Sequence, residues 1–280
     1  TSHDVVGKLR GILHMKKIGH TGTLDPDATG VLPVALGKGT KLVDLLTDKE
    51  KTYEAVLHLG IDTDTQDMSG TVLEEKPVNV TEDEVRKVLK SFVGEQLQIP
   101  PMYSALKVNG KKLYELAREG KTVERKARPV CFYEIEPLEF HLPLVKIRVT
   151  CSKGTYIRTL CHDIGEKLGC GGCMEELLRS RVGRYSLSES HTLAQVEAAV
   201  ADGTVRDMID PVEKVLADYP ALYANSYGDR LLANGNPLSD NLVRPQHKEG
   251  WVRMYASDGT FTGIFQWDAG KKKYYPVKMF

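Results

Sequence analysis

The segment from residue 144 to residue 168 most constrains the fold, because it predicts a strand followed almost at once by a helix. Apolar side chains occupy alternate positions over residues 144–151, which is typical of a strand with one buried face. Over residues 156–168 the apolar side chains recur every three or four positions, and Gly169 follows as a helix C-terminus. A fold built only of helices or only of strands is therefore excluded.

Other segments repeat this mixture in an irregular order. Alternation over residues 53–60 predicts a second strand, and helical spacing predicts a helix over residues 4–14. Thr81–Glu84 and Thr192–Gln195 have capping-box spacing and predict two further helix starts, the second helix running to Val200. Because no regular strand–helix–strand rhythm appears, the pattern favours an α+β fold with an antiparallel or mixed sheet and flanking helices over a doubly wound parallel one.

The pattern changes after Asp210-Pro211, where short strand-like runs separated by Gly and Asp begin. These runs cover residues 251–255, 261–267 and 274–277. A chain of 280 residues also exceeds the usual size of one domain. We therefore expect one large domain over residues 1–213 and a small β domain over residues 214–280.

The octapeptide Gly-His-Thr-Gly-Thr-Leu-Asp-Pro at residues 19–26 presents one carboxylate in a constrained backbone. Pro26 disfavours the helical region for Asp25 and favours an extended conformation there. Gly19 and Gly22 lack a Cβ and so allow a partner to approach the main chain. Taken alone the cluster also fits a surface turn, but the arrangement is typical of an active-site loop.

Six segments in a fixed order resemble the TruB family of pseudouridine synthases, which isomerise uridine in RNA. They are G-H-T-G-T-L-D-P-D-A-T-G-V-L from Gly19, G-K-G-T-K-L from Gly37, K-T-Y from Lys51, P-P-M-Y-S-A-L-K from Pro100, G-T-Y-I-R-T-L from Gly154 and L-L-R-S-R-V-G from Leu177. The resemblance implies a long central mixed sheet flanked by helices, and a PUA-like RNA-binding domain at the C-terminal end. It also implies modification of uridine 55 in the T loop of transfer RNA.

The resemblance makes Asp25 the catalytic carboxylate and Arg158 its partner. Forming pseudouridine breaks the N-glycosidic bond of a uridine and rejoins the base through carbon 5, without redox chemistry or added energy. A carboxylate does this work when ionised, and a neighbouring guanidinium lowers its pKa and fixes its orientation. The sequence leaves open whether Asp25 attacks C1′ of the sugar or C6 of the base, or assists through a glycal.

A uridine inside folded RNA must be flipped out before it reaches a cleft, and aromatic and apolar faces then hold it. By resemblance, Tyr53 is the stacking tyrosine of the catalytic site, while Leu177 and Tyr156 line the same cleft. His20 fills the space that the flipped nucleotide leaves. Read without the resemblance, Tyr53 and Leu177 also fit ordinary core positions.

Charge segregation indicates a polyanionic partner although the total is zero, with 38 basic and 38 acidic residues. Residues 97–130 hold eight bases and three acids, and residues 214–280 hold nine bases and six acids. In TruB relatives the first segment is an insertion that closes over the RNA stem-loop. Lys107, Lys111 and Arg118 are accordingly expected to contact RNA phosphates, and a solvated helix face is the alternative.

Residues 37–41, Gly-Lys-Gly-Thr-Lys, invite comparison with a phosphate-binding loop. That motif needs a glycine five residues before Gly37 and a hydroxyl after the lysine, but Leu32 and Gly39 stand there. Residues 37–41 therefore do not match the phosphate-binding loop motif. The resemblance implies instead that Lys41 supports the catalytic loop or binds an RNA phosphate, and a solvated lysine fits equally.

Composition gives no indication of a metal, cofactor or membrane anchor. The five cysteines are an odd number, and Cys170 and Cys173 lack a second ligand pair at zinc spacing. Family members commonly carry His at the position of Cys173, so this chain departs from the pattern there. No apolar run is long enough to cross a bilayer. We expect a cytoplasmic monomer that acts on transfer RNA without metal or cofactor.

Three other functions compete with this reading. Guide-RNA-dependent synthases of the dyskerin type share the Asp25 loop and a PUA domain but lack a basic insertion of this kind. A non-catalytic RNA-binding or RNA-folding protein would use the same surfaces and would tolerate Asp25→Asn. A glycosidase acting on nucleosides would require two carboxylates flanking a cleft, and only Asp25 is prominent in the sequence.

Overall fold

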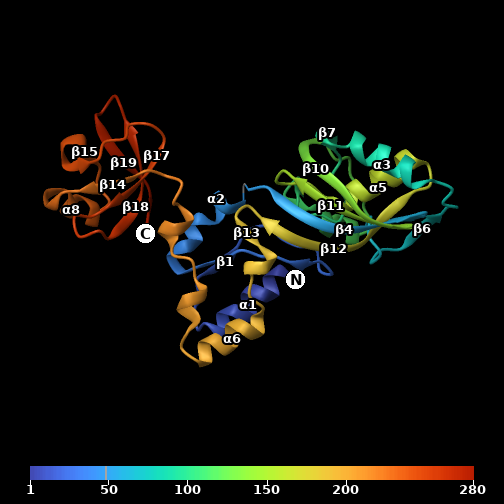
Figure 1. Ribbon diagram of the computed structural model, residues 1–280, viewed down its shortest axis with the longest axis horizontal. Helices are drawn as coiled ribbons and strands as arrows, with labels where there is room; N and C mark the ends of the chain where they lie inside the picture. The colour runs from blue at the N-terminus through green and yellow to red at the C-terminus, as the bar shows by residue number, and fades with distance from the viewer. Residues whose placement is uncertain (48) are drawn as a thin grey trace. The chain divides into compact units, whose positions relative to one another are not determined.

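The computed structural model describes residues 1–47 and 49–280, which divide into two compact units (Figure 1). Each unit gathers segments that are far apart in the sequence. The first contains Thr1–Val5, His20–Val34 and Asp44–Ser190, and the second contains Val6–Gly19, Ala35–Val43 and His191–Phe280. The Asp25 loop and the strand–helix segment at residues 144–168 therefore belong to the same unit.

A seven-stranded sheet forms the centre of the first unit. Its strands follow the order β13-β12-β4-β11-β10-β7, and β2 pairs with β12. The bounds are Tyr185–Ser186 for β13, Gly172–Val182 for β12, Lys51–Leu59 for β4, Leu144–Cys151 for β11, Arg128–His141 for β10, Gly94–Gln98 for β7 and Thr29–Gly30 for β2. All neighbours in this order are antiparallel, and β2 is parallel to β12, so the predicted mixed sheet is confirmed.

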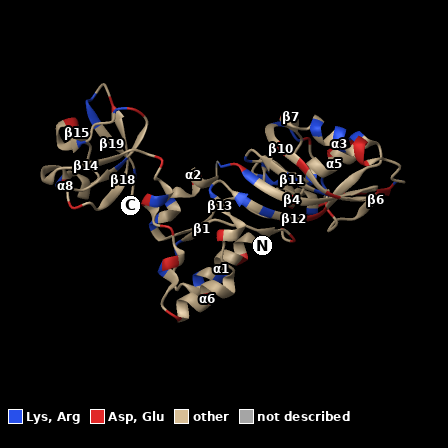
Figure 2. Cartoon of the chain, viewed as in Figure 1, with Lys and Arg blue, Asp and Glu red and all other residues tan. Residues whose placement is uncertain are grey.

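Two helices pack on the face of the sheet to which β4 and β11 turn their alternate buried residues. Helix α3 spans Glu82–Ser91 and begins with the predicted capping box at Thr81; helix α5 spans Ile157–Leu168 and ends at Gly169, whose φ is 79°. Figure 2 shows acidic and basic residues together on α3.

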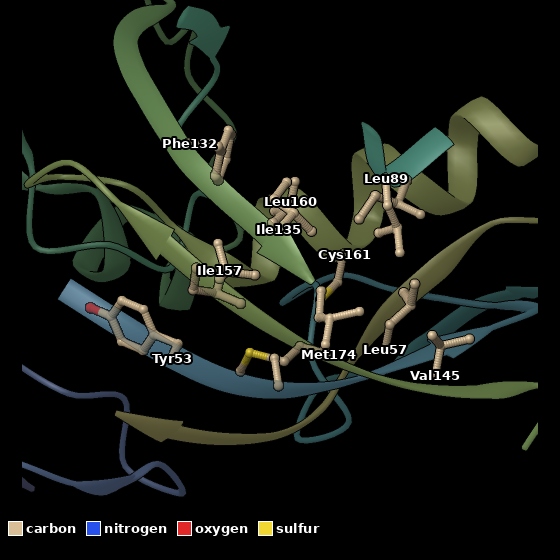
Figure 3. Close-up of a cluster of buried hydrophobic side chains, with 14 of the residues drawn as sticks. Tyr53, Leu57, Leu89, Phe132, Ile135, Val145, Ile157, Leu160, Cys161 and Met174 are labelled. Carbon is tan, nitrogen blue, oxygen red and sulfur yellow. The ribbon is translucent and has the colours of Figure 1, made fainter. Parts of the chain in front are cut away.

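The apolar core between the sheet and these helices contains Leu57, Leu89, Ile147, Leu160 and Ile164, each at most 1% exposed. Burying each such side chain contributes roughly 2 kcal/mol. Tyr53 stands at the edge of this core, with its hydroxyl directed away from it (Figure 3).

The insertion between β7 and β10 has an apolar cluster of its own. It contains strands β8 (Lys107–Val108) and β9 (Lys111–Lys112) and helix α4 (Leu113–Arg118). Met102, Leu113 and Leu116 are buried against one another. Asn109-Gly110 has positive φ at both positions and closes the β8–β9 hairpin, and helix α4 follows directly after β9.

The second unit is built mainly around a six-stranded sheet with the order β15-β19-β18-β17-β14-β16. The bounds are Leu238–Ser239 for β15, Lys273–Met279 for β19, Phe261–Asp268 for β18, Trp251–Tyr255 for β17, Ala221–Ala224 for β14 and Val243–Arg244 for β16. Helix α8, Ser226–Ala233, packs on this sheet over a core that includes Leu222, Met254 and Phe265. The three short strands predicted from residue 251 onward are confirmed.

Shorter elements complete the described residues. They are α1 (Ser2–Ile12), β1 (Ile18–His20), β3 (Val34–Leu36), the 3-10 helix η1 (Gly37–Leu42), α2 (Val43–Thr47), β5 (Ile61–Thr63), β6 (Val72–Glu75), η2 (Leu187–Glu189), α6 (Leu193–Ala201), η3 (Val205–Met208), α7 (Val212–Val215) and η4 (Asp240–Leu242). The predicted helices at residues 4–14 and 192–200 correspond to α1 and α6. Within residues 1–47 and 49–280, no helix has the length and apolar character that crossing a membrane requires.

Candidate active site

The loop that carries Asp25 is held by hydrogen bonds from three other segments. The Ser2 hydroxyl accepts from the Leu24 amide at 2.9 Å, and the Thr21 amide donates to the Pro33 carbonyl at 3.1 Å. Arg179 on β12 donates to the Val31 carbonyl at 2.8 Å. The loop backbone is therefore fixed on both sides of the carboxylate.

Arg179 is a site residue that the sequence analysis missed. It is 1% exposed, and a second nitrogen donates to the Gly22 carbonyl at 3.4 Å. It is the Cα partner of Tyr53 in the β12–β4 register. The sequence does carry a signal for Arg179, because it lies two residues after Leu177 in the L-L-R-S-R-V-G segment.

Arg158 lies in the first turn of α5 and faces both oxygens of Asp25. Its Nη2 donates to Oδ1 at 3.0 Å, and its Nε lies 2.9 Å from Oδ2. The same Nη2 donates to the Tyr103 carbonyl at 2.9 Å, and Nη1 donates to the Thr65 carbonyl at 3.0 Å. Since the arginine side chain is only 5% exposed, these contacts fix the orientation of the guanidinium.

Asp67 adds a second carboxylate that the sequence analysis did not identify. One of its oxygens lies 3.4 Å from Arg158 Nη1. The other accepts from the Thr65 hydroxyl at 2.7 Å and from the Ser69 amide at 3.1 Å. The run of small and polar residues after β5 was the available signal. Because Asp67 is bound to Arg158 and to its own loop, it orients the guanidinium.

The pKa of Asp25 is raised above its ordinary value, chiefly because burial disfavours the charged carboxylate. The Arg158 guanidinium opposes this shift, and the negative charge of Asp67 adds to it. Asp25 therefore depends on Arg158 to remain ionised in a partly dehydrated site. A carboxylate in this state can act as a nucleophile or stabilise a developing positive charge.

Tyr53, Tyr156 and Leu177 all lie in the first unit around this ion pair. Tyr53 is 8% exposed on β4, and burial raises its pKa to about 12, so the phenol is neutral. Tyr156 immediately precedes α5, and burial is the main cause that raises its pKa as well. Leu177 packs on the core that contains Tyr53. The charge of Asp25 acts on both phenols.

His20 ends β1 and is partly buried. Burial is the largest cause of its lowered pKa, which keeps the imidazole neutral. Its Nδ1 is buried and has no hydrogen-bond partner among the residues described. A neutral ring of this kind suits stacking better than ion pairing.

The four basic residues expected to bind RNA occupy two different places. Lys107, Lys111 and Arg118 are exposed on the insertion, where Lys111 lies 3.5 Å from Glu119. Lys41 belongs to the second unit and donates to the Met279 carbonyl on β19. The structure therefore gives Lys41 a partner that the sequence did not suggest.

No group of three or more His, Cys, Asp or Glu side chains among the described residues is arranged to hold a metal ion. The Cys170 thiol donates to the Gly171 carbonyl, and the Cys173 sulfur lies 3.4 Å from that of Met68. Burial raises the pKa of Cys173 to about 12, which disfavours the thiolate that a metal requires.

Two family profiles match consecutive parts of the chain. The TruB family pseudouridylate synthase N-terminal domain matches residues 10–157. The tRNA pseudouridylate synthase B C-terminal domain matches residues 158–217. The boundary between the two matches falls between Ile157 and Arg158.

Similar proteins span nearly the same length. The tRNA pseudouridine synthase B of Lachnoclostridium phytofermentans is 52% identical and covers 100% of this chain and 95% of the relative. That of Clostridium novyi is 47% identical, with 94% and 90% covered. Among solved structures, a Cbf5-Nop10-Gar1 complex aligns with a TM-score of 0.73 at 29% identity, covering 100% of this chain and 81% of the other. An H/ACA RNP bound to a substrate RNA containing 2'-deoxyuridine aligns with a TM-score of 0.72 at 28% identity, with the same two shares covered.

Proposed function

The chain belongs to the TruB family of pseudouridine synthases, and from this premise we propose that it converts uridine 55 of transfer RNA to pseudouridine. It is an isomerase whose substrate is transfer RNA. The observation that supports this most directly is the double contact of Arg158 with the two oxygens of Asp25. The relatives that are more than 40% identical are named tRNA pseudouridine synthase B, whereas the Cbf5 and H/ACA RNP structures are 28–29% identical.

Asp25 and Arg158 have different roles in the reaction. Asp25 acts in its charged form on the flipped uridine while the glycosidic bond breaks and the base rejoins through carbon 5. Arg158 keeps the carboxylate ionised and oriented, which removes the need to arrange it during the reaction. The reaction leaves the atomic composition of the nucleotide unchanged, so it requires no redox partner and no energy-rich cosubstrate.

The aromatic and apolar residues of the site hold the extruded base. Tyr53 offers an aromatic ring for stacking on the base, and its phenol is neutral at physiological pH. Tyr156 at the N-cap of α5 and Leu177 on β12 enclose the base. His20 occupies the gap that the nucleotide leaves in the RNA loop, where its neutral ring stacks without an ion-pair partner.

Two basic segments bind the rest of the RNA. Residues 97–130 form an insertion in a catalytic domain of residues 1–213, and Lys107, Lys111 and Arg118 reach phosphates of the T stem-loop. Residues 214–280 form a PUA-like RNA-binding domain, with Lys41 supporting its last strand. We expect the protein to act in the cytoplasm, and as a monomer, because the Asp25–Arg158 pair and the residues around it all come from one chain.

The test is release of tritium from carbon 5 of labelled uridine in an unmodified transfer RNA, without added metal or nucleotide. We expect release by the wild type and none by Asp25→Asn, because the amide cannot act as a nucleophile or carry the negative charge. Binding of transfer RNA by Asp25→Asn is the control and should be retained. Equal release by the two proteins would overturn the role of Asp25, and absence of release by the wild type would favour a non-catalytic RNA-binding protein.

A further inference from the structure

Gln98 ends β7 and is 4% exposed, although glutamine is usually found at the surface. Its side-chain amide makes two hydrogen bonds to the backbone of one residue, Tyr156. The amide Nε2 donates to the Tyr156 carbonyl at 3.0 Å, and the amide Oε1 accepts from the Tyr156 N–H at 2.9 Å. The side chain thus pairs with Tyr156 as a neighbouring strand would.

Tyr156 occupies a position where the backbone has few other constraints. It is the N-cap of α5, with an extended φ of −104° and ψ of 112°, and no side chain caps the helix there. Its carbonyl also accepts the first helical hydrogen bond, from the Leu160 amide at 3.1 Å. Gln98 therefore fixes the residue from which the helix starts.

Arg158 follows two residues later, in the first turn of α5. A shift of Tyr156 would carry this turn with it and move the guanidinium relative to Asp25. The next residue has a fixing contact of its own, because the Thr159 hydroxyl donates to the Gln66 side chain at 2.8 Å. The position of Arg158 is thus set from both sides along the chain.

Gln98 also lies where the insertion leaves the sheet. It is the Cα partner of Arg128 in the β7–β10 register, so the insertion departs and returns at this pair. Tyr103, five residues farther along, accepts a hydrogen bond from Arg158. The base of the RNA-binding insertion and the catalytic arginine therefore meet at one buried side chain.

We propose that Gln98 is a positioning residue for the isomerisation: its paired hydrogen bonds to Tyr156 hold Arg158 in the orientation that faces Asp25. The proposal rests on the proposed function, and it adds to the site a residue that touches neither substrate nor carboxylate. Gln98 acts through the backbone of Tyr156 alone.

Three variants separate positioning from general structural support. Gln98→Met keeps the side-chain length but removes both hydrogen bonds. Gln98→Glu keeps an acceptor for the Tyr156 N–H. Gln96→Met is the matched control, because Gln96 lies on the same strand and its amide donates at 3.4 and 3.3 Å to the Ser91 and Phe92 carbonyls, outside the catalytic site.

The first readout is the single-turnover rate of tritium release at saturating transfer RNA. We expect Gln98→Met to lower this rate about 100-fold, the effect of misplacing a catalytic group by about 1 Å. Gln98→Glu should fall between Gln98→Met and the wild type, and Gln96→Met should match the wild type. The dissociation constant for transfer RNA should not change in any of them.

The second readout is the pH dependence of that rate. The charged groups that face Asp25 are Arg158 from α5, Asp67 from the loop after β5 and Asp27 from its own loop, while the phenols of Tyr53 and Tyr156 are neutral. The positive charge of Arg158 lowers the pKa of Asp25 and so opposes the effect of burial. Displacing Arg158 weakens this interaction, and the pKa of Asp25 rises. The acidic limb of the profile should therefore move to higher pH in Gln98→Met and remain in place in Gln96→Met.

Hydrogen exchange at the Tyr156 amide gives a readout that does not depend on activity. Gln98→Met should accelerate exchange there, whereas Gln96→Met should not. A Gln98→Met protein with the wild-type rate and pH profile overturns the proposal, as does a rate loss matched by an equal loss of RNA affinity. If Gln98→Met does not fold, Gln98→Glu decides by the same measurements. A wild type that releases no tritium overturns the proposed function instead.

Discussion

Every nitrogen of the Arg158 guanidinium contacts an oxygen, and these oxygens come from three separate loops. Asp25, the Thr65–Asp67 turn and Tyr103 are far apart in the sequence. A lysine would supply one point charge in place of this planar set of donors. At the scale of single residues, the site therefore depends on the geometry of the Arg158 side chain as well as on its charge.

The substitution Asp67→Asn tests how the charge of Asp67 affects the pKa of Asp25. The substitution keeps an oxygen for the Thr65 hydroxyl and Ser69 amide but removes the charge that raises the pKa of Asp25. Asp25 should then ionise at lower pH, so the acidic limb of the rate profile should move to lower pH. The plateau rate should fall about tenfold, because Arg158 loses its ion-pair contact with Asp67 and is less firmly oriented.

The comparison for Asp67→Asn is Asp27→Asn. Asp27 also raises the pKa of Asp25 through its charge, but its effect ranks below that of Asp67. Asp27→Asn should move the acidic limb in the same direction without the loss of plateau rate. A limb that moved to higher pH in Asp67→Asn would contradict this account of the site.

At the scale of elements, local patterns predicted some strands and helices correctly, but of the seven strands of the central sheet they predicted only β4 and β11. The strand at residues 144–151, the capping box at Thr81 and the helix stop at Gly169 each depend on neighbouring residues, and all are present. Asp25 and Arg158 were assigned through the resemblance, and they meet in the structure. What the sequence could not show is which distant backbone each buried polar side chain reaches.

Arg179, Asp67 and Gln98 illustrate this limit. Each is a polar residue in an ordinary local context, and its partner lies far away in the sequence: Val31 for Arg179, Arg158 for Asp67 and Tyr156 for Gln98. Periodicity places a residue on a face of its own element but carries no information about such contacts. Only the sheet order and the loop paths bring these groups together.

Gly30→Ala is a prediction at this scale. Gly30 has a φ of 111°, and a Cβ there would lie 2.2 Å from the Arg179 carbonyl oxygen, within the parallel β2–β12 pair. We expect the free energy of unfolding to fall by more than about 3 kcal/mol, since backbone strain and a steric clash combine. Chemical denaturation measures this loss.

Gly94→Ala is the matched control for Gly30→Ala. Its φ of 103° is similar, but an added Cβ would meet nothing within 4 Å. It should therefore show the cost of backbone strain alone, about 1–3 kcal/mol. Equal losses in the two variants would show that the contact with Arg179 does not constrain residue 30.

At the scale of the whole molecule, the net charge is zero, yet the insertion at residues 97–130 is basic and has an apolar cluster of its own. Met102, Leu113 and Leu116 bury one another there, in a cluster separate from the central core of the sheet. Surface charges of the insertion can therefore be changed without disturbing that core. This separation allows RNA affinity to be altered independently of folding.

Replacing Lys107, Lys111 and Arg118 together by glutamine should reduce the salt dependence of transfer RNA binding. The slope of log K against log salt concentration should become shallower by roughly 2, because three phosphate contacts are lost and each contributes about 0.7 to the slope. The catalytic rate at saturating RNA should not change. Filter binding at several salt concentrations measures the slope.

The control for this triple variant replaces Lys87 and Lys90, which are exposed on α3. Their replacement should leave the slope unchanged, because α3 packs on the core and is not part of the insertion. An equal change of slope in both variants would mean that the insertion has no special role in binding phosphates.

Groups of the protein itself supply every oxygen that contacts the Arg158 guanidinium in the contacts described above. Because protein groups alone make these contacts, we expect the catalytic pair to be assembled before the RNA binds, so that flipping the base out of the RNA is the main rearrangement that precedes chemistry. A transfer RNA in which the contacts around the T loop are weakened should let the target base unstack at a lower cost in free energy. Its uridine should therefore be converted faster than that of a rigidly folded transfer RNA.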